Sequence, residues 1–94
     1  MTFRTLAGME AVIELMSRAG CSTCARAETE LARILADYGL AASVVDVDQR
    51  ADAGDPLLRA EYGDRVPVVV VNGVEHSYWE VDEPRLRRDL DALR

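Results

Sequence analysis

Two cysteines stand three positions apart in the segment Gly20-Cys21-Ser22-Thr23-Cys24. They follow the apolar run 12–16 and precede a stretch of helical period, so we expect them at a strand-to-helix junction. A C-x-x-C pair at such a junction is typical of a redox dithiol. Unpaired N–H groups and the positive end of the helix dipole favour a thiolate in the first helical turn, so Cys21 is the candidate nucleophile. Cys24, one turn further in, is expected to be more buried and to resolve a mixed disulfide formed on Cys21.

Three other interpretations of the cysteine pair remain open at this point. A zinc site needs four ligands, and an intrachain site would have only His76 and a carboxylate to complete it. A metal or cluster bridging two subunits is the second alternative. Two buried core cysteines without chemistry are the third, since free cysteine is among the most buried residue types. We expect His76 itself to be an exposed or half-buried strand residue rather than an acid–base partner.

The length and composition indicate one globular domain. The chain has 94 residues, of which 49% are hydrophobic and 30% charged. We assign residues 1–94 to a single domain, with 1–9 as a mobile lead-in. No apolar stretch resembles a membrane span or a signal peptide, so we expect a cytoplasmic protein, in which paired cysteines favour reactivity over a structural disulfide. The net charge of −6 disfavours nucleic acid. We therefore expect a monomer with neither a nucleic acid nor a membrane as partner.

The elements that must position the dithiol form a βαβ pattern. Residues 10–16 predict a strand, apolar residues at helical spacing predict a helix over 22–38, and residues 42–48 predict a second strand. We expect the hydroxyls of Ser22 and Thr23 to cap the helix. Alternation places Asp46 and Asp48 on one side of the second strand, where we interpret them as a polar edge rather than a metal or catalytic pair.

The second half of the chain predicts a short helix, a hairpin and a last helix. Asp55 and Pro56 fit an N-cap and first helical position, with Gly63 at the end. Four valines after Pro67 predict a buried strand, and Asn72-Gly73 predicts a two-residue turn into an antiparallel strand over 74–79. A final helix is expected to open at residues 82–84. Tyr78 and Trp79 are interpreted as packing residues.

The resulting order, β-α-β-α-β-β-α, resembles the thioredoxin fold and, within it, the glutaredoxins, especially their small glutaredoxin-like relatives in bacteria. The resemblance rests on Gly20-Cys21-Ser22-Thr23-Cys24, Val66-Pro67 and Asn72-Gly73, taken together in this order and spacing. It implies an α/β protein with a four-stranded mixed sheet flanked by three helices. It also implies a thiol–disulfide oxidoreductase that reduces protein disulfides or glutathione mixed disulfides, with glutathione as a co-substrate and no tightly bound cofactor.

The resemblance also assigns substrate-binding roles. It implies that Pro67 is cis and lies beside the dithiol, and that the backbone of Val66 pairs with the bound thiol peptide. It implies that Arg18 binds a carboxylate of glutathione, with Arg65 as the second candidate.

The residues between the two cysteines differ from the usual family pattern. Ser22 and Thr23 stand where typical dithiol glutaredoxins carry Pro-Tyr, which implies a different substrate groove. A serine after the first cysteine also occurs in glutaredoxins that hold an iron–sulfur cluster between two subunits. A non-catalytic cluster or metal binder and an inert thioredoxin-fold adaptor therefore stand as the alternative functions.

Overall fold

The computed structural model describes residues 11–93. Its elements are β1 (Ile13–Ser17), α1 (Ser22–Ala36), β2 (Ala42–Asp46), α2 (Val47–Asp52), α3 (Leu57–Tyr62), β3 (Val68–Val71), β4 (Val74–Tyr78) and α4 (Glu83–Ala92). The lead-in predicted over residues 1–9 lies outside the described residues, as does Glu10 at the start of the first predicted strand.

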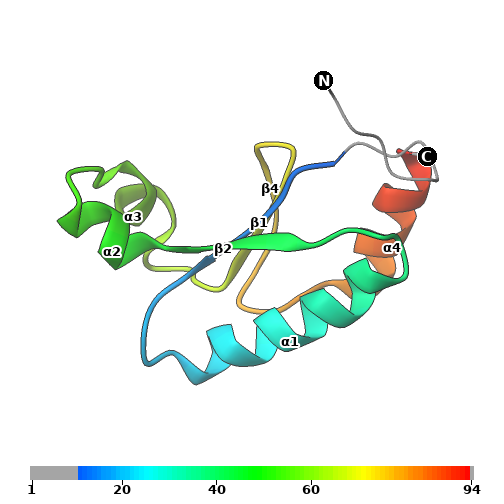
Figure 1. Cartoon of the computed structure of the whole chain (residues 1–94), viewed down its shortest axis with the longest axis horizontal. Helices are drawn as coiled ribbons and strands as arrows, with labels where there is room; N and C mark the ends of the chain where they lie inside the picture. Colours follow the sequence, from blue (N-terminus) through cyan, green and yellow to red (C-terminus); the bar gives the residue numbers. More distant parts are fainter. Residues whose placement is uncertain (1–10, 94) are drawn as a thin grey trace.

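The four strands form one mixed sheet in the order β2-β1-β3-β4. β1 pairs with β2 in parallel and with β3 antiparallel, and β3 pairs antiparallel with β4. This arrangement confirms the predicted α/β thioredoxin fold (Figure 1). The central strand, β1, delivers the chain directly to the two cysteines at the start of α1.

Helices cover both faces of the sheet because its inner strands are apolar on both sides. On one face, Ile13, Leu15 and Val69 pack with residues of α1 and α4. On the other face, Met16, Val68 and Val70 pack against α2 and α3 through Val47, Leu58 and Tyr62. In Figure 1, α2 and α3 lie at the left end of the sheet, and α1 runs below the sheet along its length. The continuous valine run of β3 is thus buried from both directions, as its sequence predicts.

One helix was not predicted. The second strand ends at Asp46, and the chain turns at once into α2. The Oδ1 atom of Asp46 accepts hydrogen bonds from the N–H groups of Asp48 and Gln49, each at 3.0 Å. This side-chain cap gives the backbone a helical alternative to strand pairing. The prediction that Asp46 and Asp48 share one side of a strand was therefore wrong. Within residues 11–93, four helices flank the sheet rather than the three predicted.

Other element boundaries shift by one to three residues. β1 begins at Ile13, so the strand predicted for residues 11 and 12 was wrong, and it ends at Ser17 rather than Met16. α1 ends at Ala36, before the predicted residue 38. The N-cap of α3 is Pro56 rather than Asp55. The carboxylate of Asp55 still accepts a long hydrogen bond, 3.4 Å, from the N–H of Leu57. These shifts leave the order of the elements unchanged.

The hairpin between β3 and β4 is the one predicted. Asn72 and Gly73 both have positive φ, 51° and 81°, which a two-residue turn of this kind requires. The Asn72 side chain adds a tertiary contact, because its Oδ1 accepts the N–H of Val12 at 2.8 Å. The turn is thereby attached to the residue that precedes β1.

Candidate functional site

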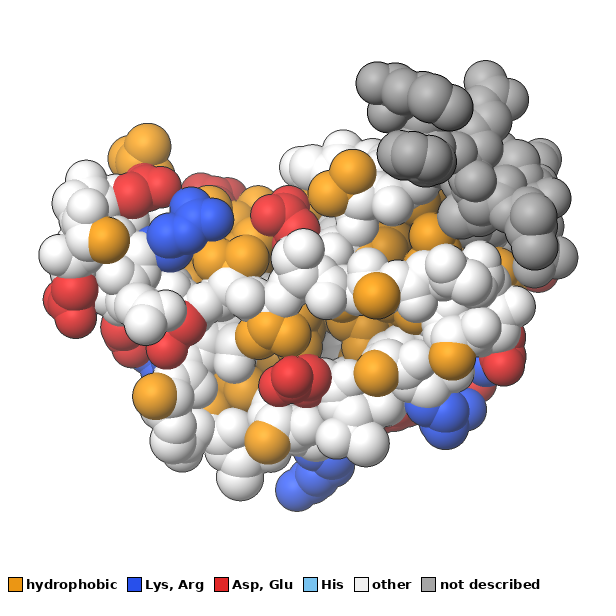
Figure 2. Space-filling model, in the orientation of Figure 1, with side chains coloured by type: hydrophobic (Ala, Val, Ile, Leu, Met, Phe, Trp, Pro, Cys, Tyr) orange, Lys and Arg blue, Asp and Glu red, His pale blue; other side chains and the backbone are white. Residues whose placement is uncertain are grey.

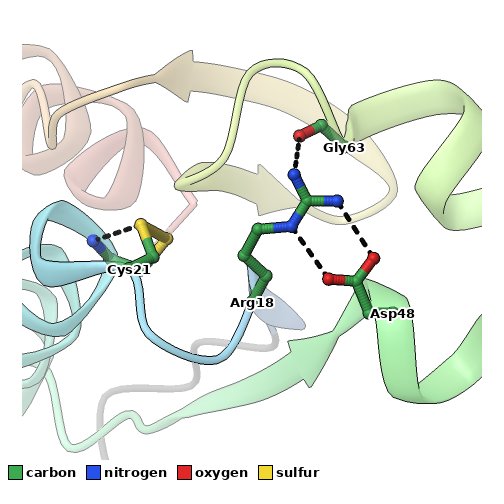
Figure 3. Close-up of a disulfide and its surroundings, with 5 residues drawn as sticks. Arg18, Cys21, Asp48 and Gly63 are labelled. Carbon is green, nitrogen blue, oxygen red and sulfur yellow. Dashed lines mark hydrogen bonds and ion pairs between the residues drawn. A yellow bond between two sulfur atoms is a disulfide. The ribbon is translucent and has the colours of Figure 1, made fainter.

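The two cysteines form a disulfide, with their Cα atoms 5.2 Å apart. Cys21 is half-buried, whereas Cys24 is only 1% exposed. Cys21 has extended backbone angles and is the N-cap of α1. Its Sγ accepts a hydrogen bond from the N–H of Cys24 at 3.1 Å (Figure 3). A donor aimed at this sulfur, at the positive end of a 15-residue helix, stabilises negative charge on Cys21.

Ser22 and Thr23 occupy the first turn of α1 and are exposed. The prediction that their hydroxyls cap the helix was wrong, because the sulfur of Cys21 takes that position. Thr23 instead lines a shallow groove with Arg26, Trp79 and Glu80. Of the two inter-cysteine residues, Thr23 therefore lines this groove beside the disulfide.

Arg18 is held by partners within the chain. Its guanidinium donates to both carboxylate oxygens of Asp48, at 2.9 and 3.0 Å, and to the carbonyl oxygen of Gly63 at 3.2 Å. The side chain points away from Cys21 toward α2 (Figure 3). The hydrogen bond with Arg18 lowers the pKa of Asp48, and the same bond raises the pKa of Arg18. Arg18, which the resemblance predicts to bind a carboxylate of glutathione, therefore already binds the carboxylate of Asp48.

Arg65 is also paired. It contacts Glu75 on β4 at 2.8 Å and Asp64 at 3.5 Å, and its guanidinium lies 5.9 Å from the centre of the Tyr62 ring. The hydrogen bond with Glu75 raises the pKa of Arg65. Both arginines singled out from the sequence thus face carboxylates of this chain.

The Val66–Pro67 peptide bond is cis, as the resemblance implied. Pro67 is buried, and Val66 is half-buried against the core on the α2 side of the sheet. The carbonyl oxygen of Pro67 accepts the N–H of Trp79 at 2.7 Å. This contact joins the cis-proline segment to the residue that follows β4.

Tyr78 and Trp79 are not the packing residues predicted. They are 47% and 60% exposed and contact each other edge to face, with ring centres 4.9 Å apart. β4 is an edge strand that ends at Tyr78, and Trp79 has a positive φ of 69°, so the core does not enclose either ring. Two aromatic rings are therefore available at the surface beside the Pro67 segment.

His76 belongs to a separate cluster. Its Nε2 lies 2.8 Å from the Asp89 carboxylate on α4, and its side chain is 6% exposed. Arg85 donates to its carbonyl oxygen. Within residues 11–93, no group of three or more His, Cys, Asp or Glu side chains is arranged to hold a metal ion. The intrachain zinc alternative thus has no ligand set in this part of the chain.

A dithiol at the start of α1 and a cis-proline before β3, on a four-stranded mixed sheet, define a thioredoxin-fold protein. A family model confirms this and narrows it. Residues 12–91 match the glutaredoxin-like domain (DUF836), and the chain belongs to that family. In the described part of the chain, residues 11–93, no helix is both long and apolar enough to span a membrane.

Relatives are known in sequence and in structure. An uncharacterized protein of Mycobacterium tuberculosis, Rv0508, is 53% identical over 78 residues, which is 83% of this chain and 80% of the relative. An X-ray structure from X. campestris is 31% identical, with a TM-score of 0.58 over 88% of this chain and all of the other. Protein Ne2328 from Nitrosomonas europaea aligns at a TM-score of 0.72 and 20% identity, over 96% of this chain and 99% of its own. Fasciola hepatica thioredoxin aligns at 0.60 and 18% identity, over 90% and 82%. The last two show the fold.

Proposed function

We propose that the protein is a thiol–disulfide oxidoreductase in which Cys21 is the nucleophile and Cys24 the resolving cysteine. One observation carries the proposal: Cys21, with its sulfur at the start of α1, is accessible and disulfide-bonded to a buried Cys24. A substrate can therefore reach the sulfur of Cys21, while the sulfur of Cys24 is buried and close enough to bond to it. Membership of the glutaredoxin-like family fits a redox role.

The proposed reaction balances as two exchange steps. The Cys21 thiolate attacks one sulfur of a substrate disulfide, which forms a mixed disulfide and expels the other substrate sulfur as a thiolate. Cys24, as its thiolate, then attacks the Sγ of Cys21 and expels the second substrate thiolate. The dithiol loses two electrons and two protons, and the substrate gains them. An external thiol reductant must regenerate the dithiol, and we propose that the reaction takes place in the cytoplasm on a monomer.

The residues around the sulfur atoms have supporting roles in this proposal. The N–H of Cys24 stabilises the Cys21 thiolate, which is the attacking group in the first step. In the second step the leaving group is the substrate thiolate, and the Sγ of Cys21 is the atom attacked. Thr23, on the groove beside the cysteines, and Val66, before the cis-proline, would contact the substrate chain. No tightly bound cofactor is required, because both electrons reside on the two sulfurs.

The test is a redox titration of the Cys21–Cys24 pair combined with single-cysteine variants. The disulfide fraction is measured across glutathione buffers after alkylation and intact mass analysis, and we expect a reversible transition in the range of about −200 to −270 mV. Cys21→Ser should abolish exchange with a disulfide substrate. Cys24→Ser should accumulate a mixed disulfide on Cys21, visible as an added mass.

The matched control is Thr29→Ala, which changes an exposed residue further along α1 and neither sulfur, and it should leave exchange unchanged. An unimpaired Cys21→Ser variant, or thiols that form no disulfide at any buffer potential, would overturn the mechanism. Visible absorbance after anaerobic reconstitution with iron and sulfide, together with a doubled mass in solution, would instead support the cluster-binding alternative.

A further inference from the structure

Three arginines, Arg18, Arg26 and Arg65, lie on the segments around the two cysteines and the cis-proline, and of these Arg18 makes two hydrogen bonds to one carboxylate. Its guanidinium binds Asp48 through two parallel hydrogen bonds, a geometry that is stronger and more specific than a single contact. A fourth arginine, Arg59 on α3, lies 3.7 Å from the same carboxylate, and the Gly63 carbonyl oxygen accepts a further N–H of Arg18. The cation nearest to Cys21 in sequence is thus directed away from it (Figure 3).

The other two arginines also lie near carboxylates, and within residues 11–93 Arg65 is the one of the two that forms ion pairs. Arg65, two residues before Pro67, contacts Glu75 and Asp64. Arg26, one turn into α1, shares the groove beside Thr23 with Glu30 and Glu80.

Around the dithiol and the cis-proline segment, carboxylates therefore outnumber the arginines in the described part of the chain. The whole chain has the same sign of charge, a net −6. On the face shown in Figure 2, acidic and basic side chains are interspersed.

We propose that Asp48 determines substrate choice, because by occupying Arg18 it makes the dithiol discriminate against carboxylate-bearing disulfides such as glutathione disulfide and favour disulfides with uncharged or cationic neighbours. This proposal rests on the proposed function and specifies its substrate class. It makes Asp48 a specificity-determining residue that acts through Arg18, with Glu75 acting in the same way on Arg65.

The physical reason is a competition between an internal and an external carboxylate. A tethered partner acts at an effective concentration of roughly millimolar or more, so an anionic substrate at micromolar concentration cannot displace Asp48 from Arg18. An anionic disulfide also approaches a chain of net negative charge, which slows its association, whereas a cationic one is attracted. Both effects weaken as salt screens the charges, since the Debye length falls to about 10 Å at 0.1 M.

The experiment uses three small symmetric disulfides that differ in charge. Pre-reduced protein is mixed with cystamine (cationic), bis(2-hydroxyethyl) disulfide (uncharged) or glutathione disulfide (anionic), and the rate of dithiol oxidation is measured. Each rate is divided by that of dithiothreitol with the same disulfide, which removes differences in leaving-group reactivity. At low ionic strength we expect the normalised rate to fall by about tenfold from the uncharged to the anionic disulfide, and to rise for the cationic one.

Asp48→Asn is the decisive variant. It should raise the ratio of anionic to uncharged rates by about three- to tenfold, because Arg18 becomes free to bind a substrate carboxylate. Glu75→Gln is a second variant that acts through Arg65 and does not depend on the stability of α2. Asp55→Asn is the matched control, since Asp55 has similar side-chain exposure (46% against 41% for Asp48) and pairs with Arg50 instead. It should leave the ratio unchanged.

The outcomes separate this inference from the proposed function. The wild type could exchange with all three disulfides at normalised rates that do not depend on charge and do not change with Asp48→Asn or Glu75→Gln. That result would overturn the inference but not the proposed oxidoreductase function. No exchange with any disulfide would overturn both.

Two disulfide-bonded peptides, identical except for Lys or Glu beside the cysteine, distinguish the source of the substrate. A faster Lys peptide that also exceeds the uncharged small disulfide assigns the substrate to polypeptides. Equal rates for that peptide and the small disulfide assign it to an uncharged small thiol, and a faster Glu peptide overturns the inference.

Discussion

Gly63 occupies a position where an added methyl group meets backbone. Its φ and ψ of −57° and −31° are ordinary helical values that alanine also adopts. On that ground alone, Gly63→Ala should stabilise the protein by about 0.4–1 kcal/mol, because alanine lowers the conformational entropy of the unfolded chain. However, an ideal Cβ at Gly63 lies 2.6 Å from the carbonyl oxygen of Arg59 and 3.1 Å from its Cγ. We therefore predict that Gly63→Ala destabilises the protein.

The magnitude follows from what must move. The Arg59 oxygen already accepts the N–H of Gly63 at 2.8 Å, so relief of the clash opens the last turn of α3 or displaces the loop that leads to Pro67. Strain of this kind typically costs about 1–3 kcal/mol. We expect a net loss of about 2 kcal/mol and a melting temperature lower by roughly 10 °C for a domain of this size. The loop displacement would also lengthen the contact from Arg18 to the Gly63 carbonyl.

The assay is urea unfolding of wild type and variant, with the m-value as the check on two-state behaviour. Gly73→Asn and Gly63→Asn form a matched pair of controls. Gly73 has a φ of 81° and nothing within 4 Å of an ideal Cβ, so asparagine, which tolerates this conformation, should cost little there. At Gly63, asparagine should be as costly as alanine. A Gly63→Ala protein at least as stable as wild type would refute the reasoning.

Three further predictions concern stability. Leu86→Ala should cost about 3 kcal/mol in urea unfolding, because Leu86 is fully buried between α4 and the sheet. Asn72→Ala should lower the free energy of unfolding by about 1–2 kcal/mol, since it places alanine at positive φ and removes the acceptor of the Val12 N–H. Asn72→Gly should lose the hydrogen bond but recover the part of this cost that comes from alanine at positive φ. The hydrogen bond from the Arg85 N–H holds the pKa of Asp82 below its ordinary value of 3.8, so the stabilising contribution of this carboxylate is present above that pH and is lost as the pH falls through the folded-state pKa. In Asp82→Asn, the melting temperature should therefore decrease less steeply with falling pH below about pH 4 than in the wild type. The same pH dependence in both proteins would contradict this assignment.

The sequence predicts the elements whose signals are local. The cysteine pair ends up at a strand-to-helix junction because the apolar run before it and the helical period after it are both unambiguous. The Asn72-Gly73 turn follows from two residues that tolerate positive φ. The valine run of β3 is buried on both faces because no polar residue interrupts it. In each case one stretch of a few residues contains all the information needed.

What the sequence does not predict depends on contacts between distant residues. The Arg18–Asp48 pair joins positions 30 residues apart, and it exists because Asp46 caps a six-residue helix too short to show a period. The spacing Asp-x-Asp at the end of a strand was the signal for that cap, and it was interpreted as a strand edge. The exposure of Trp79 likewise depends on a backbone conformation fixed by the Pro67 carbonyl. The Arg18–Asp48 contact, on which the proposed substrate preference rests, therefore could not be predicted from the sequence.

The central place of β1 also has a consequence for how the protein opens. Among residues 11–93, β1 is hydrogen-bonded to a strand on each side, whereas β2 and β4 each have a neighbouring strand on one side alone. Amides of an inner strand exchange with solvent through the largest and least frequent opening of a domain, and edge strands exchange through smaller ones. The segment that ends at Cys21 is therefore attached to the most slowly opening part of the chain. Local openings at the edge strands should therefore leave the positions of the two sulfur atoms relative to each other unchanged.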